Sequence, residues 1–238
     1  NRTRKWIIGM QSKNGGWGAF DADNSFEYLN YIPFADHGAL LDPPSVDVTA
    51  RCLSFLGQIN NEKDSTVIEK AITYIINEQE KDGSWFGRWG TNYIYGTWSV
   101  LSAINLINFD KKVFITSKAV DYLKKSQRKD GGWGEDGSTY ENKNLKIVKD
   151  STPSQTAWAI LGLISAGEIK SKEVELGINY LSNNFSHGRW KEKLYTAVGF
   201  PKVFYLKYHG YSEYFPLLAI SRYKNLIQSN YLKTSSGV

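Results

Sequence analysis

The chain of 238 residues contains a single cysteine, no long apolar run and no concentration of charge of one sign. Cys52 alone cannot form an internal disulfide, which fits a protein of a reducing compartment. Because no stretch reaches about 18 consecutive apolar residues, no segment is predicted to cross a membrane as a helix. The net charge of +5 comes from scattered basic residues, so the basic stripe of a nucleic-acid groove is missing and no nucleic-acid partner is predicted.

What the sequence does contain is a repeated unit of glutamine, glycine and tryptophan. Three copies share one internal spacing and a fourth has Asn in place of Gln: Gln11-x3-Gly15-x-Trp17, Gln79-x3-Gly83-x-Trp85, Gln127-x3-Gly131-x-Trp133 and Asn184-x3-Gly188-x-Trp190. A unit that recurs about every 50 to 70 residues is typical of a repeat architecture. We expect a helix to end at each Gln, a glycine turn to follow, and the Trp to fold back over the join.

Two kinds of helical segment alternate along the chain. Amphipathic segments with one charged face end at the units, at 68–79, 117–127 and 173–183. Segments that are apolar on all sides lie between them, at 46–58, 93–107, 153–166 and 214–227, and such helices are usually buried between others. The order predicts an all-α fold of alternating outer and inner helices with no β-sheet. Pro153 and Pro216 fit the first turns of two inner helices.

Several longer motifs accompany the units in a fixed order. They are WIIGMQSKNGGWGAFDADN at 6–24, DPPSVDVTA at 42–50, DGSWFGRWG at 82–90, TPSQTAWA at 152–159 and GFPKVFYLKY at 199–208. Together with the four units, this set resembles the squalene–hopene cyclase family from Trp6 to about Leu226. A single unit is a weak signal, whereas the ordered set is a specific one.

The resemblance implies a fold and a reaction. Members of the family fold as two α-barrel domains around a large apolar cavity and draw a linear polyprene from the bilayer. The middle Asp of an Asp-x-Asp-Asp motif protonates a terminal alkene. Rings then close through carbocations, and the reaction ends in proton loss or water capture. No metal or organic cofactor takes part. By this likeness we expect conversion of squalene to hopene- or hopanol-type pentacyclic triterpenes.

The resemblance also implies a location and partners. Family members bind a membrane surface without spanning it, so we expect a peripheral, monotopic protein on the cytoplasmic side of the cell membrane. The expected partners are an apolar polyprene such as squalene and the membrane surface of the full-length protein. A homodimer is compatible with this interpretation.

The proton donor of the family is absent from this chain. Asp21-Ala22-Asp23-Asn24 has a similar composition, but its fourth residue is Asn, and we interpret it as a turn with Asx hydrogen bonds. The family's catalytic ring has twelve helices, whereas eight are predicted here. The resemblance therefore implies that residues 1–238 are the C-terminal portion of the catalytic domain, an incomplete (α/α)6 barrel of helical hairpins. The acid, the start of the domain and the second barrel are expected outside the chain.

Asp47 and Arg51 match the positions at which the family supports its catalytic acid, with an Asp and a His one helical turn apart. At i and i+4 on a predicted inner helix, the two side chains share a face. Arg departs from the family's His. A permanent cation favours the ionised carboxylate and strengthens the acid, but it cannot shuttle a proton back. An ordinary helix ion pair is the alternative interpretation.

Carbocations need stabilisation by groups that do not trap them. An aromatic ring attracts a cation by on the order of 2 kcal/mol when desolvated and offers no reactive lone pair. The family's substrate- and cation-binding positions are matched here by Phe20, Phe34, Trp89, Tyr95, Phe200, Phe204, Tyr208 and Tyr211. The last four-residue spacings, from Phe200 to Phe204 and on to Tyr208, align the rings if this stretch is helical. On spacing alone an aromatic stripe is more often core, so the resemblance carries this assignment.

Two further assignments concern the segment after Phe34. His37 stands where the family usually has Phe. An imidazole beside a carbocation would be trapped by a covalent bond to it or would act as the base that ends the reaction. This departure leaves the exact substrate and product open. Phe34, Ala35 and Asp36 match the family's constriction between the access channel and the cavity, with an ordinary loop turn as the alternative.

Other functions stay open at this point. Arg51 and His37 leave room for a cyclase of tetraprenyl-β-curcumene, the sporulenol type, instead of squalene. The β subunit of protein prenyltransferases is also a helical-hairpin barrel, but it needs a zinc site of Asp, Cys and His, and Cys52 has no suitably placed His. No metal site is predicted. The remaining interpretation is a non-catalytic scaffold or binding module.

Overall fold

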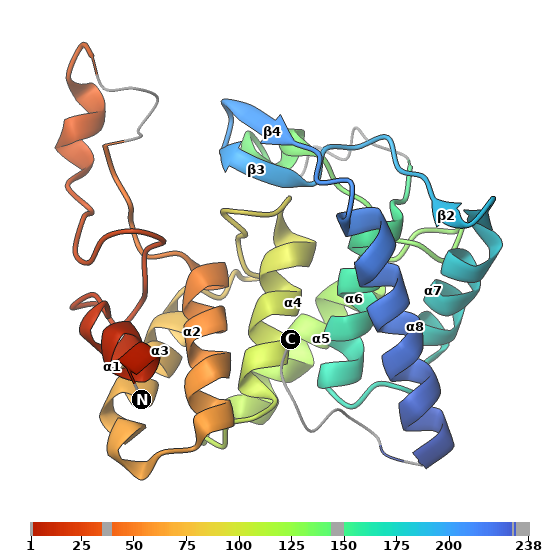
Figure 1. The fold of residues 1–238 in the computed structure, drawn as a ribbon, viewed down its shortest axis with the longest axis horizontal. Helices are drawn as coiled ribbons and strands as arrows, with labels where there is room; N and C mark the ends of the chain where they lie inside the picture. The colour runs from red at the N-terminus through yellow and green to blue at the C-terminus, as the bar shows by residue number, and fades with distance from the viewer. Residues whose placement is uncertain (1, 35–39, 144–149, 230, 232–238) are drawn as a thin grey trace.

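The computed structural model describes residues 2–34, 40–143, 150–229 and 231, and it arranges eight α-helices of these residues in two layers (Figure 1). The inner layer consists of α2 (Val46–Ile59), α4 (Tyr93–Ile104), α6 (Pro153–Ser165) and α8 (Tyr211–Ser229), each packed against the next. The outer layer consists of α1 (Arg2–Gly9), α3 (Ser65–Asn77), α5 (Lys112–Ser126) and α7 (Lys172–Asn183). The inner helices form a row with α2 and α8 at opposite ends. The predicted helical fold and its alternation of outer and inner helices are confirmed.

The central inner helix shows why these segments are apolar on all sides. Every residue of α6 is buried, because α6 packs against α4, α8 and the outer helix α7. Thr152 caps the helix by accepting a hydrogen bond from the Gln155 N–H, and Pro153 occupies the first turn, as predicted. The prediction for Pro216 is wrong. Helix α8 begins at Tyr211, whose ring packs on Trp158, so Pro216 lies inside the helix.

Each Gln–Trp unit ties one outer helix to the next through its side chains. The Gln amide donates to the carbonyl of the unit's Gly and to a carbonyl of the following outer helix: Gln11 to Gly15 and Val67, Gln79 to Gly83 and Ile115, and Gln127 to Gly131 and Glu173. The Trp indole donates back to the preceding helix: Trp17 to Ile7, Trp85 to Ile75, Trp133 to Leu123 and Trp190 to Leu181. The expected folded-back tryptophan is confirmed.

The glycine of each unit is required by the backbone of the turn. Gly15 and Gly83 have φ of 94° and Gly131 has φ of 85°, a conformation that side-chain-bearing residues rarely adopt. In the fourth copy the Asn184 amide instead donates to the Tyr180 carbonyl of its own helix. The helices end one or two residues before the Gln or Asn, close to the predicted boundary.

The expectation of no β-sheet is wrong. The described residues form two short antiparallel hairpins: β1 (Phe185–Ser186) pairs with β2 (Arg189–Trp190), and β3 (Ala197–Phe200) pairs with β4 (Phe204–Leu206). Strand β3 also bonds to the loop before α4, where the Val198 N–H donates to the Trp89 carbonyl at 3.2 Å. The hairpin depends on this partner more than 100 residues away in the sequence, which a local pattern does not reveal.

Short 3-10 helices complete the connections, namely η1 (Glu27–Tyr31), η2 (Glu62–Asp64) and η3 (Gly137–Tyr140). The segment with η1 projects beyond α2, and the β3–β4 hairpin lies above the inner layer near α4 and α6 (Figure 1). Among the described helices, none combines the length and the apolar character needed to cross a membrane.

Candidate functional site

A hollow of about 230 Å³ opens where the first turns of α2 and α4 meet the loops that follow Trp17 and Trp85. We call it the aromatic hollow, and its walls are Ala19, Phe20, Asp47, Val48, Arg51, Trp89 and Tyr95. Five of these seven residues were predicted from the sequence as site residues. The structure therefore brings both predicted acid-supporting residues and three predicted rings to one place.

Asp47 is the buried carboxylate of this hollow. Its Oδ2 accepts a hydrogen bond from the Trp89 backbone N–H at 2.7 Å, and only 2% of the residue is exposed. Because Asp47 lies in the first turn of α2, the helix dipole also favours a negative charge there. The sequence places Asp47 on an inner helix, but its partner in the loop before α4 became evident only from the structure.

Arg51 lies one turn along α2 and points toward α4. Its guanidinium is 4.3 Å from the centroid of the Trp98 ring, and its Nη2 is 3.5 Å from the Ser99 Oγ. A guanidinium over an indole face makes a favourable cation–π contact. The hollow thus holds a buried carboxylate and a permanent cation on neighbouring turns of one helix.

Phe20 and Trp89 form the outer rim of the hollow. Their ring centroids are 6.0 Å apart and the rings meet edge to face. The backbone at Phe20 is fixed by the buried Asp42 carboxylate, which accepts hydrogen bonds from the N–H groups of Ala19, Phe20 and Asp21. Phe20 is 73% exposed, so no other described residue covers the hollow at this rim.

Behind the hollow lies an aromatic cluster made of Tyr95, Trp98, Trp158, Tyr211 and Phe215. Trp98 and Trp158 stack with centroids 5.8 Å apart, and Tyr95 meets Trp158 edge to face at 4.9 Å. Tyr211 and Phe215 of α8 close the cluster on its far side. Burial raises the pKa values of Tyr95 and Tyr211, so both hydroxyls stay protonated at neutral pH.

Sequence reasoning missed three members of this cluster, namely Trp98, Trp158 and Phe215. One signal was present: Tyr95 and Trp98 are three residues apart on an inner helix and therefore share a face. The indole N–H groups of Trp98 and Trp158 are buried without a hydrogen-bond partner among the described residues. Their rings present faces rather than polar contacts to their surroundings.

Phe200 and Phe204 lie on the β3–β4 hairpin and not on a helix, so the predicted helical alignment with Tyr208 is wrong. The two rings still meet, with centroids 5.6 Å apart, because a register shift after Val198 pairs Phe200 with Phe204 across the hairpin. Tyr208 packs on Tyr211 at 5.1 Å and so joins the edge of the aromatic cluster. None of these residues lines the aromatic hollow.

The predicted constriction is only partly visible. Phe34 follows η1 and is 82% exposed. Ala35, Asp36 and His37 lie outside the described residues. Asp21-Ala22-Asp23-Asn24 forms a bend in which Asp23 has a left-handed φ of 59°. The Asn24 side chain donates to the Asp21 carboxylate at 3.0 Å, so the bond within the segment joins two side chains and is not the expected Asx bond to the backbone.

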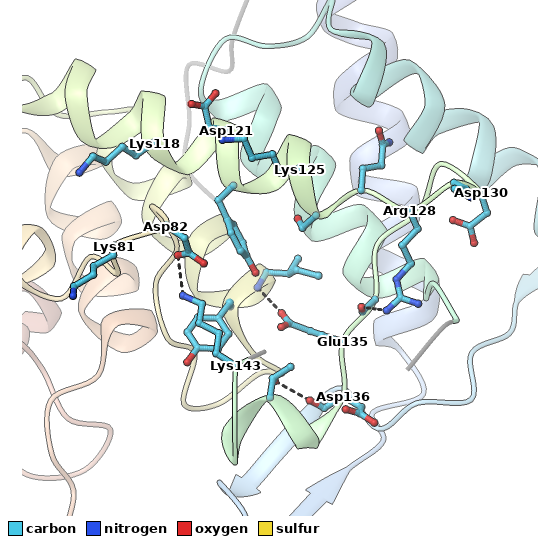
Figure 2. Close-up of a pocket in the computed structure, with 18 residues that line it drawn as sticks. Lys81, Asp82, Lys118, Asp121, Lys125, Arg128, Asp130, Glu135, Asp136 and Lys143 are labelled. Atoms are coloured by element: carbon cyan, nitrogen blue, oxygen red, sulfur yellow. Dashed lines mark hydrogen bonds and ion pairs between the residues drawn. The ribbon is translucent and has the colours of Figure 1, made fainter. Parts of the chain in front are cut away.

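A second, larger hollow of about 970 Å³ lies between α5, the start of α4 and the loops that carry Asp82 and Glu135 (Figure 2). We call it the charged hollow, since Lys and Arg side chains alternate with Asp and Glu around it. Lys143 reaches into it, donates to the Asp82 carboxylate at 2.8 Å, and lies 4.0 Å from the centroid of the Tyr93 ring. Ionic walls of this kind do not suit an apolar guest, because desolvating them costs free energy.

The charged hollow nevertheless supports the site through Glu135. The Glu135 Oε1 accepts hydrogen bonds from the N–H groups of Asn92 at 3.0 Å and Ile94 at 2.6 Å. These N–H groups lie at the start of α4, where the helix itself provides no acceptor for them. Burial raises the pKa of the Glu135 carboxyl, and these hydrogen bonds offset the rise only in part. Glu135 thus anchors the first turn of the helix that carries Tyr95 and Trp98.

No group of three or more His, Cys, Asp or Glu side chains in the described part of the chain could hold a metal ion. Cys52 is a free, half-buried thiol whose pKa is raised by burial to about 12. The chemistry available in the aromatic hollow is therefore that of a carboxylate, a guanidinium and aromatic faces. Such a set holds an apolar guest and stabilises positive charge that develops on it.

Comparisons of the sequence with known proteins agree on one family. The profile described as "Squalene-hopene cyclase C-terminal domain" matches residues 1–225. The squalene–hopene cyclase of Schizosaccharomyces japonicus is 60% identical over 230 residues, which cover 96% of this chain and 35% of that protein. The enzyme of the same name from Zymomonas mobilis is 55% identical over 231 residues, with the same two shares. The sporulenol synthase of Bacillus subtilis is 40% identical over 225 residues, 94% of this chain and 36% of that protein.

Solved structures show the same architecture at low sequence identity. The ent-copalyl diphosphate synthase from Streptomyces platensis aligns with a TM-score of 0.64 at 15% identity, over 90% of this chain and 36% of that chain. This likeness concerns the fold alone. The chain spans 35% of the length of the curated relatives that it matches first.

Proposed function

Since this chain belongs to the squalene–hopene cyclase family, within the C-terminal domain, we propose that it is part of an enzyme that converts squalene to hopene- or hopanol-type triterpenes. Residues 1–238 are the C-terminal portion of the catalytic α/α-barrel domain in this proposal. The acid that protonates the substrate belongs to a part of the protein beyond these residues.

One observation carries the proposal: the aromatic hollow joins a buried Asp47, the Arg51 cation and three aromatic rings. Protonation of an alkene needs a strong acid, and the acid is strengthened when its conjugate base is stabilised. Asp47 and Arg51 support that acid from the first turns of α2. Arg51 supplies the positive charge, and the Trp89 N–H fixes the Asp47 carboxylate.

The reaction follows from the chemistry of the alkene. The acid gives a proton to the terminal alkene, whose π electrons form the new C–H bond and leave a tertiary carbocation. Each following alkene attacks the cation, so one C–C bond forms per ring and the charge moves along the chain. Loss of a proton gives a hopene-type product, and addition of water followed by loss of a proton gives a hopanol-type product.

The aromatic side chains stabilise these cations in turn. Phe20, Trp89 and Tyr95 serve the cations nearest to the acid, and Phe200, Phe204, Tyr208 and Tyr211 serve later ones. Burial raises the pKa of Tyr95 and keeps it neutral, which matters because a phenolate would trap a carbocation. By their match to the family motif, Phe34, Ala35 and Asp36 belong to the constriction of the access channel, and the His37 imidazole acts as the terminating base.

The surroundings are part of the same proposal. The substrate is an apolar polyprene taken from a membrane surface, and the full-length protein binds the cytoplasmic face of the cell membrane as a monotopic protein. The reaction needs no cofactor. A homodimer is the proposed assembly.

Three other functions were open from the sequence. The family match sets aside the prenyltransferase β subunit. A non-catalytic scaffold or binding module stays open for residues 1–238 taken alone, because the proposed acid is not among them. The sporulenol type stays as a second candidate because the chain is 40% identical to a sporulenol synthase and departs from the usual family residues at Arg51 and His37. The higher identity to squalene–hopene cyclases, 55% and 60%, favours squalene.

The test is to incubate the full-length protein with squalene and, separately, with tetraprenyl-β-curcumene, and to identify the products by gas chromatography and mass spectrometry. The proposal predicts pentacyclic hopene or hopanol from squalene as the preferred reaction. Preference for tetraprenyl-β-curcumene would establish the second candidate. If neither polyprene is converted by folded protein, the proposed function is wrong.

A further inference from the structure

The loop of residues 87–91 decides where the Trp89 ring and N–H lie. This loop has no regular secondary structure, and α6 holds its end, where the Gln155 amide donates to the Thr91 carbonyl at 2.9 Å. Three further elements hold the backbone around Trp89. The Trp89 N–H donates to Asp47 of α2 at 2.7 Å, and the Trp89 carbonyl accepts from the Val198 N–H of β3 at 3.2 Å. The third element is η3, through Tyr140.

Tyr140 bonds to the backbone on both sides of Trp89 in the sequence. Its hydroxyl lies within hydrogen-bond distance of two carbonyl oxygens, Gly87 at 2.6 Å and Gly90 at 3.0 Å. One proton serves both acceptors, so the hydroxyl clamps the two ends of the segment that contains Trp89. Tyr140 is buried, and burial together with the nearby Asp47 charge raises its pKa, which keeps the hydroxyl protonated as a donor.

The position of Gly90 makes this clamp relevant to Tyr95 as well. A side chain at Gly90 would place its Cβ 2.5 Å from the Tyr95 ring, so the loop backbone lies directly against that ring. A shift of the loop therefore moves Trp89 relative to Asp47 and opens the packing at Tyr95. Both rings line the aromatic hollow.

The ring of Tyr140 reaches a second part of the proposed site. It stacks on Tyr205 of β4, with centroids 6.0 Å apart and planes 26° apart. Tyr205 in turn donates to the Gly137 carbonyl at 3.2 Å, which ties the β3–β4 hairpin to η3. This hairpin carries Phe200 and Phe204, so a single residue contacts both the loop of Trp89 and the hairpin.

We propose that Tyr140 is a positioning residue for the cyclisation, which holds Trp89 and the β3–β4 hairpin in the arrangement that the successive carbocations require. The inference rests on the proposed function. Tyr140 does not line the aromatic hollow and acts only through the loop of Trp89 and the hairpin that it contacts. Its loss leaves the early cations near a displaced Trp89, so premature proton loss competes with the next ring closure.

The chain offers a matched control for the loss of such a hydrogen bond. The Tyr180 hydroxyl donates to the Ser151 carbonyl at 2.9 Å, and the Tyr74 hydroxyl donates to the Pro44 carbonyl at 2.8 Å. Both bonds join an outer helix to the residues just before an inner helix. Tyr180→Phe removes the same kind of bond as Tyr140→Phe but leaves the loop of Trp89 untouched.

The experiment compares Tyr140→Phe and Tyr180→Phe in the full-length protein with two readouts. The first is amide hydrogen exchange of the peptide that contains residues 87–91, and the second is the ratio of early-terminated to pentacyclic products from squalene. Tyr140→Phe is expected to speed exchange in this peptide on the order of tenfold. It is also expected to raise the share of mono- and bicyclic products. Tyr180→Phe is expected to change neither readout.

Unchanged exchange at residues 87–91 in Tyr140→Phe overturns the inference, whatever the activity. Faster exchange with an unchanged product ratio also overturns it, because Tyr140 is then merely structural. If Tyr140→Phe does not fold, Tyr205→Leu is the second variant. It removes the ring that stacks on Tyr140 but keeps the hydrogen bonds of the Tyr140 hydroxyl to Gly87 and Gly90. It must then show smaller changes of the exchange rate and the product ratio in the same direction. If the parent protein converts no squalene, the proposed function fails, and the exchange data still decide whether Tyr140 holds the loop.

Discussion

The guanidinium of Arg51 lies 4.3 Å from the centroid of the Trp98 ring, one helical turn from Asp47. A permanent cation thus joins the aromatic hollow to the aromatic cluster behind it. In the proposed function, Arg51 supplies a positive charge at a position where the family usually has His.

The first prediction concerns this charge. In the full-length protein, Arg51→His should make squalene turnover depend on pH between about 5 and 8, because an imidazole loses its proton in this range. Turnover should fall as the pH rises, since the neutral ring no longer stabilises the conjugate base of the acid. Initial rates across the pH range measure the effect. Arg51→Lys keeps the charge and should follow the profile of the parent; identical profiles for all three proteins would show that the charge plays no part.

The second prediction concerns Asp47. Asp47→Asn keeps an oxygen that accepts from the Trp89 N–H, so the fold and the midpoint of thermal unfolding should change little. The negative charge is lost, and squalene turnover should drop about 100-fold. Asp110→Asn, at an exposed carboxylate outside the site, is the control. Turnover of Asp47→Asn at half the parental rate or more would reduce Asp47 to a structural residue.

The third prediction concerns the Gln–Trp units. Gln79→Ala removes two hydrogen bonds, one of which joins the end of α3 to the Ile115 carbonyl of α5. It should lower the free energy of unfolding by about 2 kcal/mol. Asn184→Ala removes a bond within a single helix and should cost less. Thermal or urea unfolding of both variants decides the matter, and equal losses would show that the link between helices adds nothing.

The repeat units explain why so much of the fold was predictable from the sequence. A Gln–Trp unit is local: the Trp85 indole bonds to Ile75, ten residues away, so the pattern and the structure are linked over a short stretch. The inner helices were predictable for a similar reason, since a helix such as α6 that is buried on all sides must be apolar on all sides.

The features that sequence reasoning missed depend on distant partners. Strand β3 forms against the loop of Trp89, and the Tyr140 hydroxyl meets Gly87 across 53 residues of sequence. Neither contact leaves a periodic pattern. Trp98 and Trp158 were missed because a buried tryptophan has the same sequence signature in a plain core as in a cation-binding cluster. Only their stacking next to Tyr95 distinguishes them.

The fourth prediction uses the titration of Glu135. Burial raises the pKa of this carboxyl in the folded protein, so the folded state binds its proton more tightly than the unfolded state does. The stability that comes from this group is present at low pH and is lost as the pH rises through the folded-state pKa. Glu135→Gln keeps an acceptor for the Asn92 and Ile94 N–H groups but does not titrate.

The unfolding midpoint of Glu135→Gln relative to the parent should therefore rise as the pH is raised from about 4 to 8. Differential scanning calorimetry of both proteins at several pH values measures this difference. Glu175→Gln, at an exposed position on α7, provides the control for losing a surface carboxylate. A constant difference between Glu135→Gln and the parent across the range would contradict the assigned effect of burial.

Product analysis of Trp89 variants in the full-length protein tests the role of the aromatic faces most directly. Trp89→Phe keeps an aromatic face and Trp89→Leu does not, while both keep the backbone N–H that bonds to Asp47. With squalene as substrate, Trp89→Leu is predicted to release mono- and bicyclic products at the expense of pentacyclic ones, and Trp89→Phe to release far fewer of them. Equal product mixtures from the two variants, at equal rates, would contradict stabilisation of the carbocations by the aromatic ring.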